Sequence, residues 1–128
     1  MRKVRSGKAD PQVAAWADGV DATDMYISVV TIQELEIGIL LAERRDSAQG
    51  ALLRTWMNDH VLPAFTGRIL AVDTAVALRS ALLHVPDLRP VRDGLIAATA
   101  LVHGMVVVTR NIADFAPAGV QTLNPWIT

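Results

Sequence analysis

The sequence predicts an α/β fold in which short parallel strands alternate with helices. Segments rich in β-branched residues alternate with segments whose apolar residues have helical spacing, and this order implies parallel pairing with right-handed crossovers. The hydrophobic fraction is 52% and the mean hydropathy is +0.32, which suits a sheet covered on both faces. At 128 residues, the chain is expected to form a single domain, 1–128.

The expected strands are short runs bounded by turn residues. They are predicted at residues 25–30, 68–72, 105–108 and 121–123. A chain that opens on a loop and a helix leaves these four strands without a central partner. Their apolar edges are therefore expected to stay unpaired, which is a liability for a sheet.

The helices are predicted from capping residues and apolar spacing. Asp10 and Pro11 are expected to start a first helix that ends near Asp18. Thr31 and Glu34 have the spacing of a capping box, which places the start of the next helix at Thr31 and Glu34 in its first turn. A further helix is expected from residue 47 to near Pro63.

Two more helices are predicted in the second half of the chain. Asp73 is expected to cap a helix that turns Val76, Leu78 and Leu82 inward. The last predicted helix spans 92–103 and stops at Gly104.

Composition restricts the possible chemistry. The sequence contains no cysteine, which excludes disulfides and thiolate metal sites, so a metal would be held by oxygen or imidazole. The net charge of −1 and the pI near 6.3 give no support to nucleic-acid binding. No run reaches the ~20 apolar residues of a membrane span. The basic start lacks the apolar core of a signal peptide, so a cytoplasmic protein is expected.

Three acids follow strands or open helices at equivalent places. Glu34 and Asp93 are expected in first turns of helices, and Asp114 in a turn after the strand 105–108. The carboxyl ends of parallel strands meet at one edge of an open sheet, where such folds bind ligands. Carboxylates that converge there would suit Mg²⁺ or Mn²⁺, and such a metal would activate water for phosphodiester hydrolysis.

Each acid also has a purely structural explanation. Glu34 could only complete a capping box, worth about 1 kcal/mol. Asp93 could only favour the positive end of a helix, worth about 0.3–1 kcal/mol. Asp114 could only stabilise a turn. The three explanations are weaker jointly than singly, because all three acids would fall at one end of the sheet.

Polar neighbours of these acids add to the metal-site hypothesis. Thr109, Arg110 and Asn111 precede Asp114 and could orient water, hold Asp114 or contact a phosphate; a well-satisfied polar turn is the alternative. Glu36 is two positions from Glu34 on the same helix, so it is expected to point away into solvent.

Four stretches together resemble a known family. Ile27–Leu35, Arg92–Ala100, Thr109–Phe115 and Leu123–Trp126 are similar to the PIN-domain ribonucleases of bacterial toxin–antitoxin pairs, the VapC family, within its FitB or plasmid-stability branch. The resemblance covers essentially the whole chain from Asp10 onward.

The resemblance implies a PIN-like three-layer α/β/α fold and a Mg²⁺- or Mn²⁺-dependent endoribonuclease that cuts RNA. It also implies a homodimer that a small antitoxin protein neutralises. The family's catalytic and metal-binding roles fall on Glu34, Asp93 and Asp114. Thr109 and Asn111 match the polar residues that support the last acid.

The chain departs from the family at its start. Family members open with a central strand that ends in an Asp-Thr-Asn type motif, whose Asp is a metal ligand. Met1-Arg-Lys resembles the end of the helical turn after that motif, so the first central strand is missing here. The expectation is that its segment is encoded upstream of Met1; a truncated chain is the alternative.

Three functions are compatible with these residues. The leading one is a toxin ribonuclease with a divalent metal at Glu34, Asp93 and Asp114. The alternative is a degenerate, non-catalytic PIN domain that binds antitoxin or RNA. A domain that binds a small anionic metabolite is disfavoured, since the sequence has no glycine-rich phosphate loop such as GxGxxG.

Overall fold

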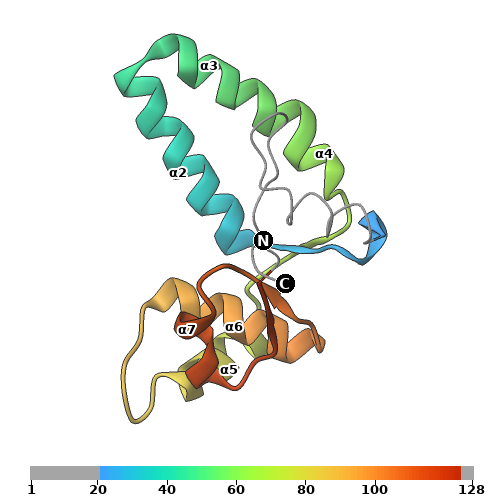
Figure 1. Ribbon diagram of the computed structural model, residues 1–128, viewed down its shortest axis with the longest axis vertical. Coiled ribbons are helices and arrows are strands. Elements are labelled where there is room, and N and C mark those ends of the chain that lie inside the picture. Colours follow the sequence, from blue (N-terminus) through green and yellow to red (C-terminus); the bar gives the residue numbers. More distant parts are fainter. Residues whose placement is uncertain (1–20, 125–128) are drawn as a thin grey trace.

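Helices make up most of the chain in the computed structural model, which describes residues 21–124 (Figure 1). The helices are α2 (Val29–Arg45), α3 (Ser47–Trp56), α4 (Leu62–Ala64), α5 (Thr74–Leu83), α6 (Val91–His103) and α7 (Ile112–Phe115). A π-helical turn, η2 (Met57–Val61), joins α3 to α4, and two 3₁₀ turns are η1 (Ala22–Asp24) and η3 (Ala116–Ala118). The predicted helix from Asp10 lies outside the described residues.

Four two-residue strands lie within the predicted strand segments. They are β1 (Ile27–Ser28), β2 (Ile69–Leu70), β3 (Val107–Val108) and β4 (Thr122–Leu123). β1 pairs in parallel with β2, and β3 pairs in parallel with β4, so the predicted parallel pairing is confirmed. Among residues 21–124, however, the strands form two separate pairs rather than one sheet.

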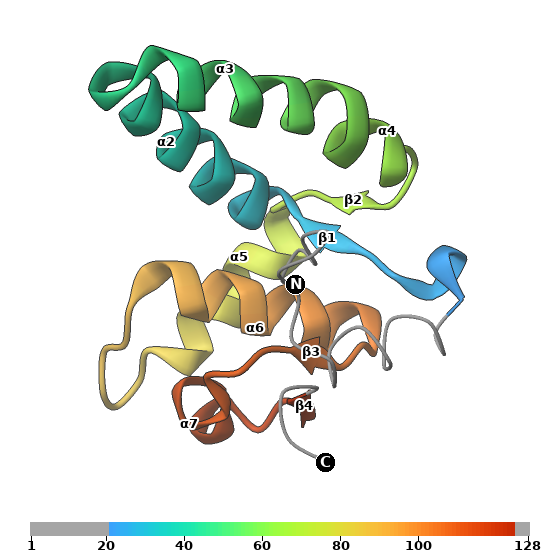
Figure 2. The same cartoon turned by 45° about the horizontal axis from the view of Figure 1, so that its top comes forward.

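Each strand pair has its own hydrophobic core. The first core lies between β1 and the helices α2 to α4, and its buried members are Ile27, Ile39, Met57, Val61 and Phe65. The second lies between α6 and β3, and its buried members are Ala97, Ala100, Val107, Phe115 and Val120. Figure 2 shows the two halves one above the other, with β1 and β2 under α2 to α4 and with β3 and β4 beside α6 and α7.

The long helix α2 begins earlier than the sequence predicts. Ser28 is its N-cap, because the Ser28 hydroxyl accepts a 3.0 Å hydrogen bond from the backbone N–H of Val30. The predicted start at Thr31 is therefore wrong, and Glu34 lies beyond the first turn instead of completing a capping box. Ser28 caps the helix at the end of the strand. Val29 and Val30, which have high β propensity, therefore lie in the first turn of α2.

The helices α2 and α3 form a tight antiparallel hairpin. Arg54 of α3 donates to both carboxylate oxygens of Glu36 at 2.7 and 2.8 Å, and to Glu43 at 3.3 Å. These hydrogen bonds hold the pKa of Glu36 below its usual value and raise that of Arg54. Glu36 thus points toward α3, and the prediction that it is only a solvated surface residue is wrong.

The helix α5 buries less of its apolar surface than its sequence predicts. Asp73 caps it as expected, accepting from the backbone N–H of Val76, and Val76 is fully buried. Leu78 and Leu82 are instead 65% and 68% exposed. Their predicted inward orientation is wrong because one narrow face of α5, with Val76 and Ser80, suffices to pack against α6.

No helix within residues 21–124 is both long and apolar enough to cross a bilayer.

The close approach of α2 to α3 depends on Gly50. A Cβ atom at Gly50 would lie 2.5 Å from the Cα atom of Glu43, whereas one at Gly38 would meet nothing within 4 Å. We expect Gly38→Ala to stabilise the fold by about 0.5–1 kcal/mol, since alanine favours a helix over glycine. Gly50→Ala has the same propensity gain but should destabilise the fold by about 1–3 kcal/mol through overpacking.

Urea denaturation of the two variants measures both free energies of unfolding. Equal stabilisation by the two substitutions would contradict this account of the hairpin.

Candidate active site

An ion pair places Glu34 of α2 against the start of α6. The Arg92 Nη1 atom lies 3.4 Å from the Glu34 Oε2 atom. Arg92 and Asp93 occupy the first turn of α6, so the pair brings Glu34 to the turn that contains Asp93. The predicted position of Asp93 at the mouth of a helix is confirmed.

Arg92 is a site residue that the sequence reasoning did not single out. Its position next to Asp93 was the available signal, since a cation beside clustered carboxylates offsets their repulsion. The Arg92 and Glu34 side chains are 59% and 36% exposed, so their ion pair contributes less than about 1 kcal/mol to stability. The ion pair matters because it places Glu34 beside the helix turn that contains Asp93.

The first turn of α6 is fixed by close packing on α5. Gly94 is buried, and a Cβ atom there would lie 2.9 Å from the Nε2 atom of His84 and 3.3 Å from the Ser80 hydroxyl. The Nδ1 atom of His84 accepts a 3.2 Å hydrogen bond from the backbone N–H of Arg89, which holds the imidazole in place. Asp93, next to Gly94, is half-buried and takes its position from this contact.

The loop before Asp114 is held by its own polar side chains. The Thr109 hydroxyl accepts a 3.0 Å hydrogen bond from the backbone N–H of Asn111, and the backbone N–H of Thr109 donates to Leu123 at the end of β4. The Asn124 amide donates to the Arg110 carbonyl at 3.5 Å. Thr109 therefore has a structural role that ties this loop to the second strand pair.

Asp114 lies in a short helix rather than in the predicted turn. It is exposed and belongs to α7, where its backbone N–H donates to the Asn111 carbonyl at 3.0 Å. Its neighbour Phe115 is buried in the second core together with Ala97 of α6. The anchored phenylalanine holds α7 against α6.

The three predicted acids are only partly gathered. Glu34 meets the first turn of α6, and Asp114 is carried by α7, which packs on the same helix. Within residues 21–124, no group of three or more acidic or imidazole side chains is close enough to hold a metal ion. Carboxylate oxygens are the donors that Mg²⁺ and Mn²⁺ prefer, so the donor type fits. A three-acid site stays a prediction.

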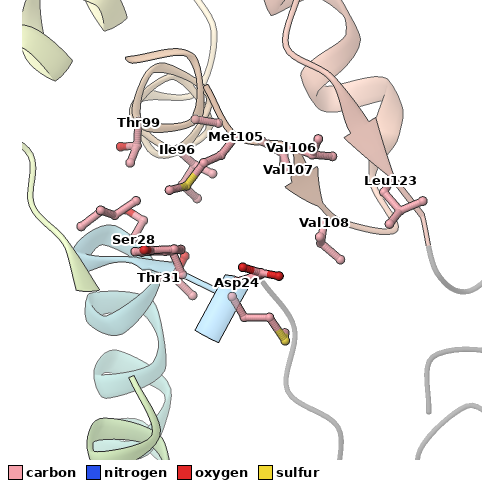
Figure 3. Close-up of a pocket in the computed structure, with 14 residues that line it drawn as sticks. Asp24, Ser28, Thr31, Ile96, Thr99, Met105, Val106, Val107, Val108 and Leu123 are labelled. Atoms are coloured by element: carbon pink, nitrogen blue, oxygen red, sulfur yellow. The ribbon is translucent and has the colours of Figure 1, made fainter. Parts of the chain in front are cut away.

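A cavity of about 430 Å³ lies between the two strand pairs (Figure 3). Its walls include Ser28 and Thr31 on one side and Val106 and Val108 on the other. None of the three predicted acids lines it, and Asp24 is the acid that does. The cavity is thus distinct from the candidate acid site.

Comparison with known proteins identifies the family. The PIN domain model matches residues 5–116. The chain belongs to the PIN-domain family. It is 36% identical over 121 residues to toxin FitB of Neisseria gonorrhoeae, with 90% of this chain and 85% of FitB covered. It is 34% identical over 126 residues to VapC ribonuclease Y4jK of Sinorhizobium fredii, with 93% and 89% covered.

The fold agrees with this family membership. The crystal structure of FitAcB from Neisseria gonorrhoeae superposes with a TM-score of 0.86 at 33% identity, covering 95% of this chain and 90% of that one. The predicted PIN-like α/β fold and the predicted resemblance to the VapC and FitB proteins are therefore confirmed.

The contact between Gly94 and His84 can be tested by a double-mutant cycle. Gly94→Ala should destabilise the fold by about 1–3 kcal/mol, because the new methyl group meets the imidazole and displaces the start of α6. His84→Ala removes the clashing atoms, so the double variant should recover part of that loss relative to His84→Ala alone. Thermal or urea unfolding measures both free energies. Additive effects would show that the two residues do not constrain each other.

Proposed function

We propose that this PIN-domain protein is the toxin of a type II toxin–antitoxin system and acts as a divalent-metal-dependent endoribonuclease. The main support is the agreement of family, names and fold, because relatives that match across most of this chain are called toxin and ribonuclease. The substrate is RNA, and the site of action is the cytoplasm, where RNA is available. The non-catalytic alternative receives no support from these relatives.

We assign metal binding and catalysis to Glu34, Asp93 and Asp114. The ion pair that brings Glu34 to the first turn of α6 supports the grouping of the first two. The packing of α7 on α6 supports the inclusion of Asp114. Mg²⁺ or Mn²⁺ bound there would activate a water molecule and neutralise the leaving oxygen of a phosphodiester.

Other residues position the substrate and the acids. Thr109 fixes the loop before α7, and Asn111 follows it with an exposed side chain that is available to water or phosphate. Arg110, also exposed, supplies a guanidinium suited to a phosphate oxygen. Arg92 offsets the negative charge of Glu34.

The partners we propose are a small cognate antitoxin and a second copy of this chain. The toxin name of the FitB relative supports the antitoxin. Exposed apolar side chains around α5 support the homodimer; this α5 surface consists of Leu78, Leu82, Val85, Leu88 and Val91, each at least 65% exposed. An apolar patch of this kind commonly marks an interaction surface.

Removal of one proposed ligand should abolish metal-dependent cleavage. In Asp93→Asn, the amide keeps the shape of the side chain but loses its charge, so cleavage of RNA with Mg²⁺ or Mn²⁺ should fall by more than about 100-fold. EDTA should abolish the activity of the unmodified protein. A fluorescence-based RNA cleavage assay measures both effects.

The matched control is Asp87→Asn, which changes an exposed acid in the loop between α5 and α6 and should leave cleavage unchanged. Undiminished cleavage by Asp93→Asn, or full activity in EDTA, would refute the assignment.

Charges on the α5 surface should dissociate the proposed dimer. The double variant Leu78→Glu with Leu82→Glu buries two carboxylates in the interface, so its dissociation constant should rise by about tenfold or more. Leu52→Glu on α3, at a site that is 74% exposed, is the matched control and should stay dimeric. Analytical ultracentrifugation gives the masses. A monomeric unmodified protein, or dimers in both variants, would contradict the proposal.

A further inference from the structure

The ion pair between Arg92 and Glu34 is a weak contact between two helices. Only the Nη1 atom of the guanidinium meets the carboxylate, at 3.4 Å from Oε2, and the Arg92 side chain is 59% exposed. Among the contacts within residues 21–124, the other carboxylate oxygen of Glu34 has no hydrogen-bond partner. Water and salt compete with an exposed pair of this kind, so Glu34 can exchange Arg92 for another cation.

A second arginine pair on α2 has the geometry of a permanent contact. Arg54 donates to both carboxylate oxygens of Glu36, at 2.7 and 2.8 Å, and also reaches Glu43. This bidentate arrangement matches the planar fork of a guanidinium to a carboxylate. Glu36 is therefore fully engaged, whereas Glu34, two positions earlier on the same helix, is held by a single long contact.

Arg92 occupies a position that does not favour an arginine. It lies in the first turn of α6, where the helix dipole is positive and repels a cation. The N-cap residue, Pro90, provides no side-chain acceptor that would reduce this charge. Glu34 is thus the counter-charge that holds Arg92 at the helix start. Once Glu34 binds another cation, this repulsion favours movement of the guanidinium into solvent.

The backbone around the pair is fixed, so an exchange requires only side-chain rotation. Gly94 packs against His84 and Ser80 of the preceding helix segment, and this packing sets the first turn of α6. On the other side, Ile39 anchors α2 in the first core. The two helices contact each other directly, and Figure 2 shows α2 above α6. The exposed Arg92 side chain is free to turn outward while both helices stay in place.

We propose that Arg92 is an exchangeable counter-ion, which holds the Glu34 carboxylate in the metal-free protein and releases it to a divalent cation. This inference rests on the metal site that we assign to Glu34, Asp93 and Asp114. Mg²⁺ and Mn²⁺ carry twice the charge of a guanidinium and bind carboxylate oxygens more closely, so they displace Arg92 when their concentration is sufficient. Arg92 is a positioning residue, because it acts through Glu34.

The exchange predicts a distinctive sign for the effect of Arg92 on metal affinity. In the metal-free protein, its charge offsets that of Glu34 and keeps this side chain beside α6. During metal binding, the same charge competes for Glu34 and raises the cation concentration that fills the site. Loss of an arginine with a purely structural role would misplace Glu34 and weaken metal binding. Loss of an exchangeable counter-ion strengthens it.

Calorimetric titration of the full 128-residue protein with Mn²⁺ measures this sign. Arg92→Gln removes the competing charge and should lower the Mn²⁺ dissociation constant by about threefold to tenfold. Arg92→Lys keeps a cation at this position and should stay within about twofold of the unmodified protein. The matched control is Arg79→Gln, which removes an exposed arginine of α5 and should also change the constant by less than about twofold, because solvent screens its charge.

The outcomes separate this inference from the metal assignment on which it rests. Equal or weaker Mn²⁺ binding by Arg92→Gln would overturn the exchange and leave the metal site standing. The same gain in Arg79→Gln would also overturn it, because the effect would then be one of net charge. Failure of every variant and of the unmodified protein to bind Mn²⁺ would overturn the exchange and the metal site together.

NMR of the arginine Nε–H groups observes the exchange itself. Glu34→Gln removes the carboxylate charge, so its Arg92 signal marks the position of an unpaired guanidinium. Addition of Mg²⁺ to the unmodified protein should move the Arg92 signal toward this position, and EDTA should restore it. The Arg54 signal should not move, because its bidentate contact with Glu36 persists. A stationary Arg92 signal at saturating Mg²⁺, or identical metal-free Arg92 signals in Glu34→Gln and the unmodified protein, would overturn the proposal.

Discussion

Backbone hydrogen bonding between very short strands is the constraint on which this structure depends. Each strand contributes only two paired residues, so neither strand pair could be stable without helices packed against it. Each strand pair packs against its own hydrophobic core, the first with α2 to α4 and the second with α6. The same division leaves a cavity of about 430 Å³ between the two strand pairs. The helices α2 and α6 carry two of the acids that we assign to catalysis, Glu34 and Asp93.

The strands and their parallel pairing could be predicted from sequence because β-branched runs and turn residues are local signals. Their lengths could not. Ser28 caps α2 within the predicted strand segment, so the helix begins where the sequence favours a strand, and Ile39 farther along α2 is buried in the first core. Periodicity also could not reveal that Leu78 and Leu82 would stay exposed, because an apolar face looks alike whether its own chain or a partner covers it.

The candidate site, too, could be predicted only where the signal in the sequence is local. The position of Asp93 in the first turn of a helix was visible in the sequence, whereas Glu34 lies beyond the first turn of α2 and Asp114 lies in the short helix α7. The contacts that place them were not, because Arg92 meets Glu34 across a sequence separation of 58 residues, and Gly94 packs closely against the His84 side chain. Long-range contacts of this kind depend on the three-dimensional arrangement of α2, α5 and α6. The predicted helix at Asp10 lies outside the described residues.

Three contacts link the segments that carry the proposed acids. Close packing at Gly94 sets the first turn of α6, the ion pair with Arg92 draws Glu34 toward it, and buried Phe115 keeps α7 on the same helix. A divalent cation held by the acids that we propose as ligands would offset the mutual repulsion of their carboxylates and activate water. The family of the chain supports an RNA substrate for this chemistry.

Titration with Mn²⁺ in an NMR experiment tests the central claim most directly, because the paramagnetic ion broadens signals only from nuclei close to it. The account predicts that the amide signals around Glu34, Asp93 and Asp114 broaden together and recover when EDTA is added. Broadening around only one of these acids, or equal broadening at the remote acid Asp59, would contradict a shared metal site.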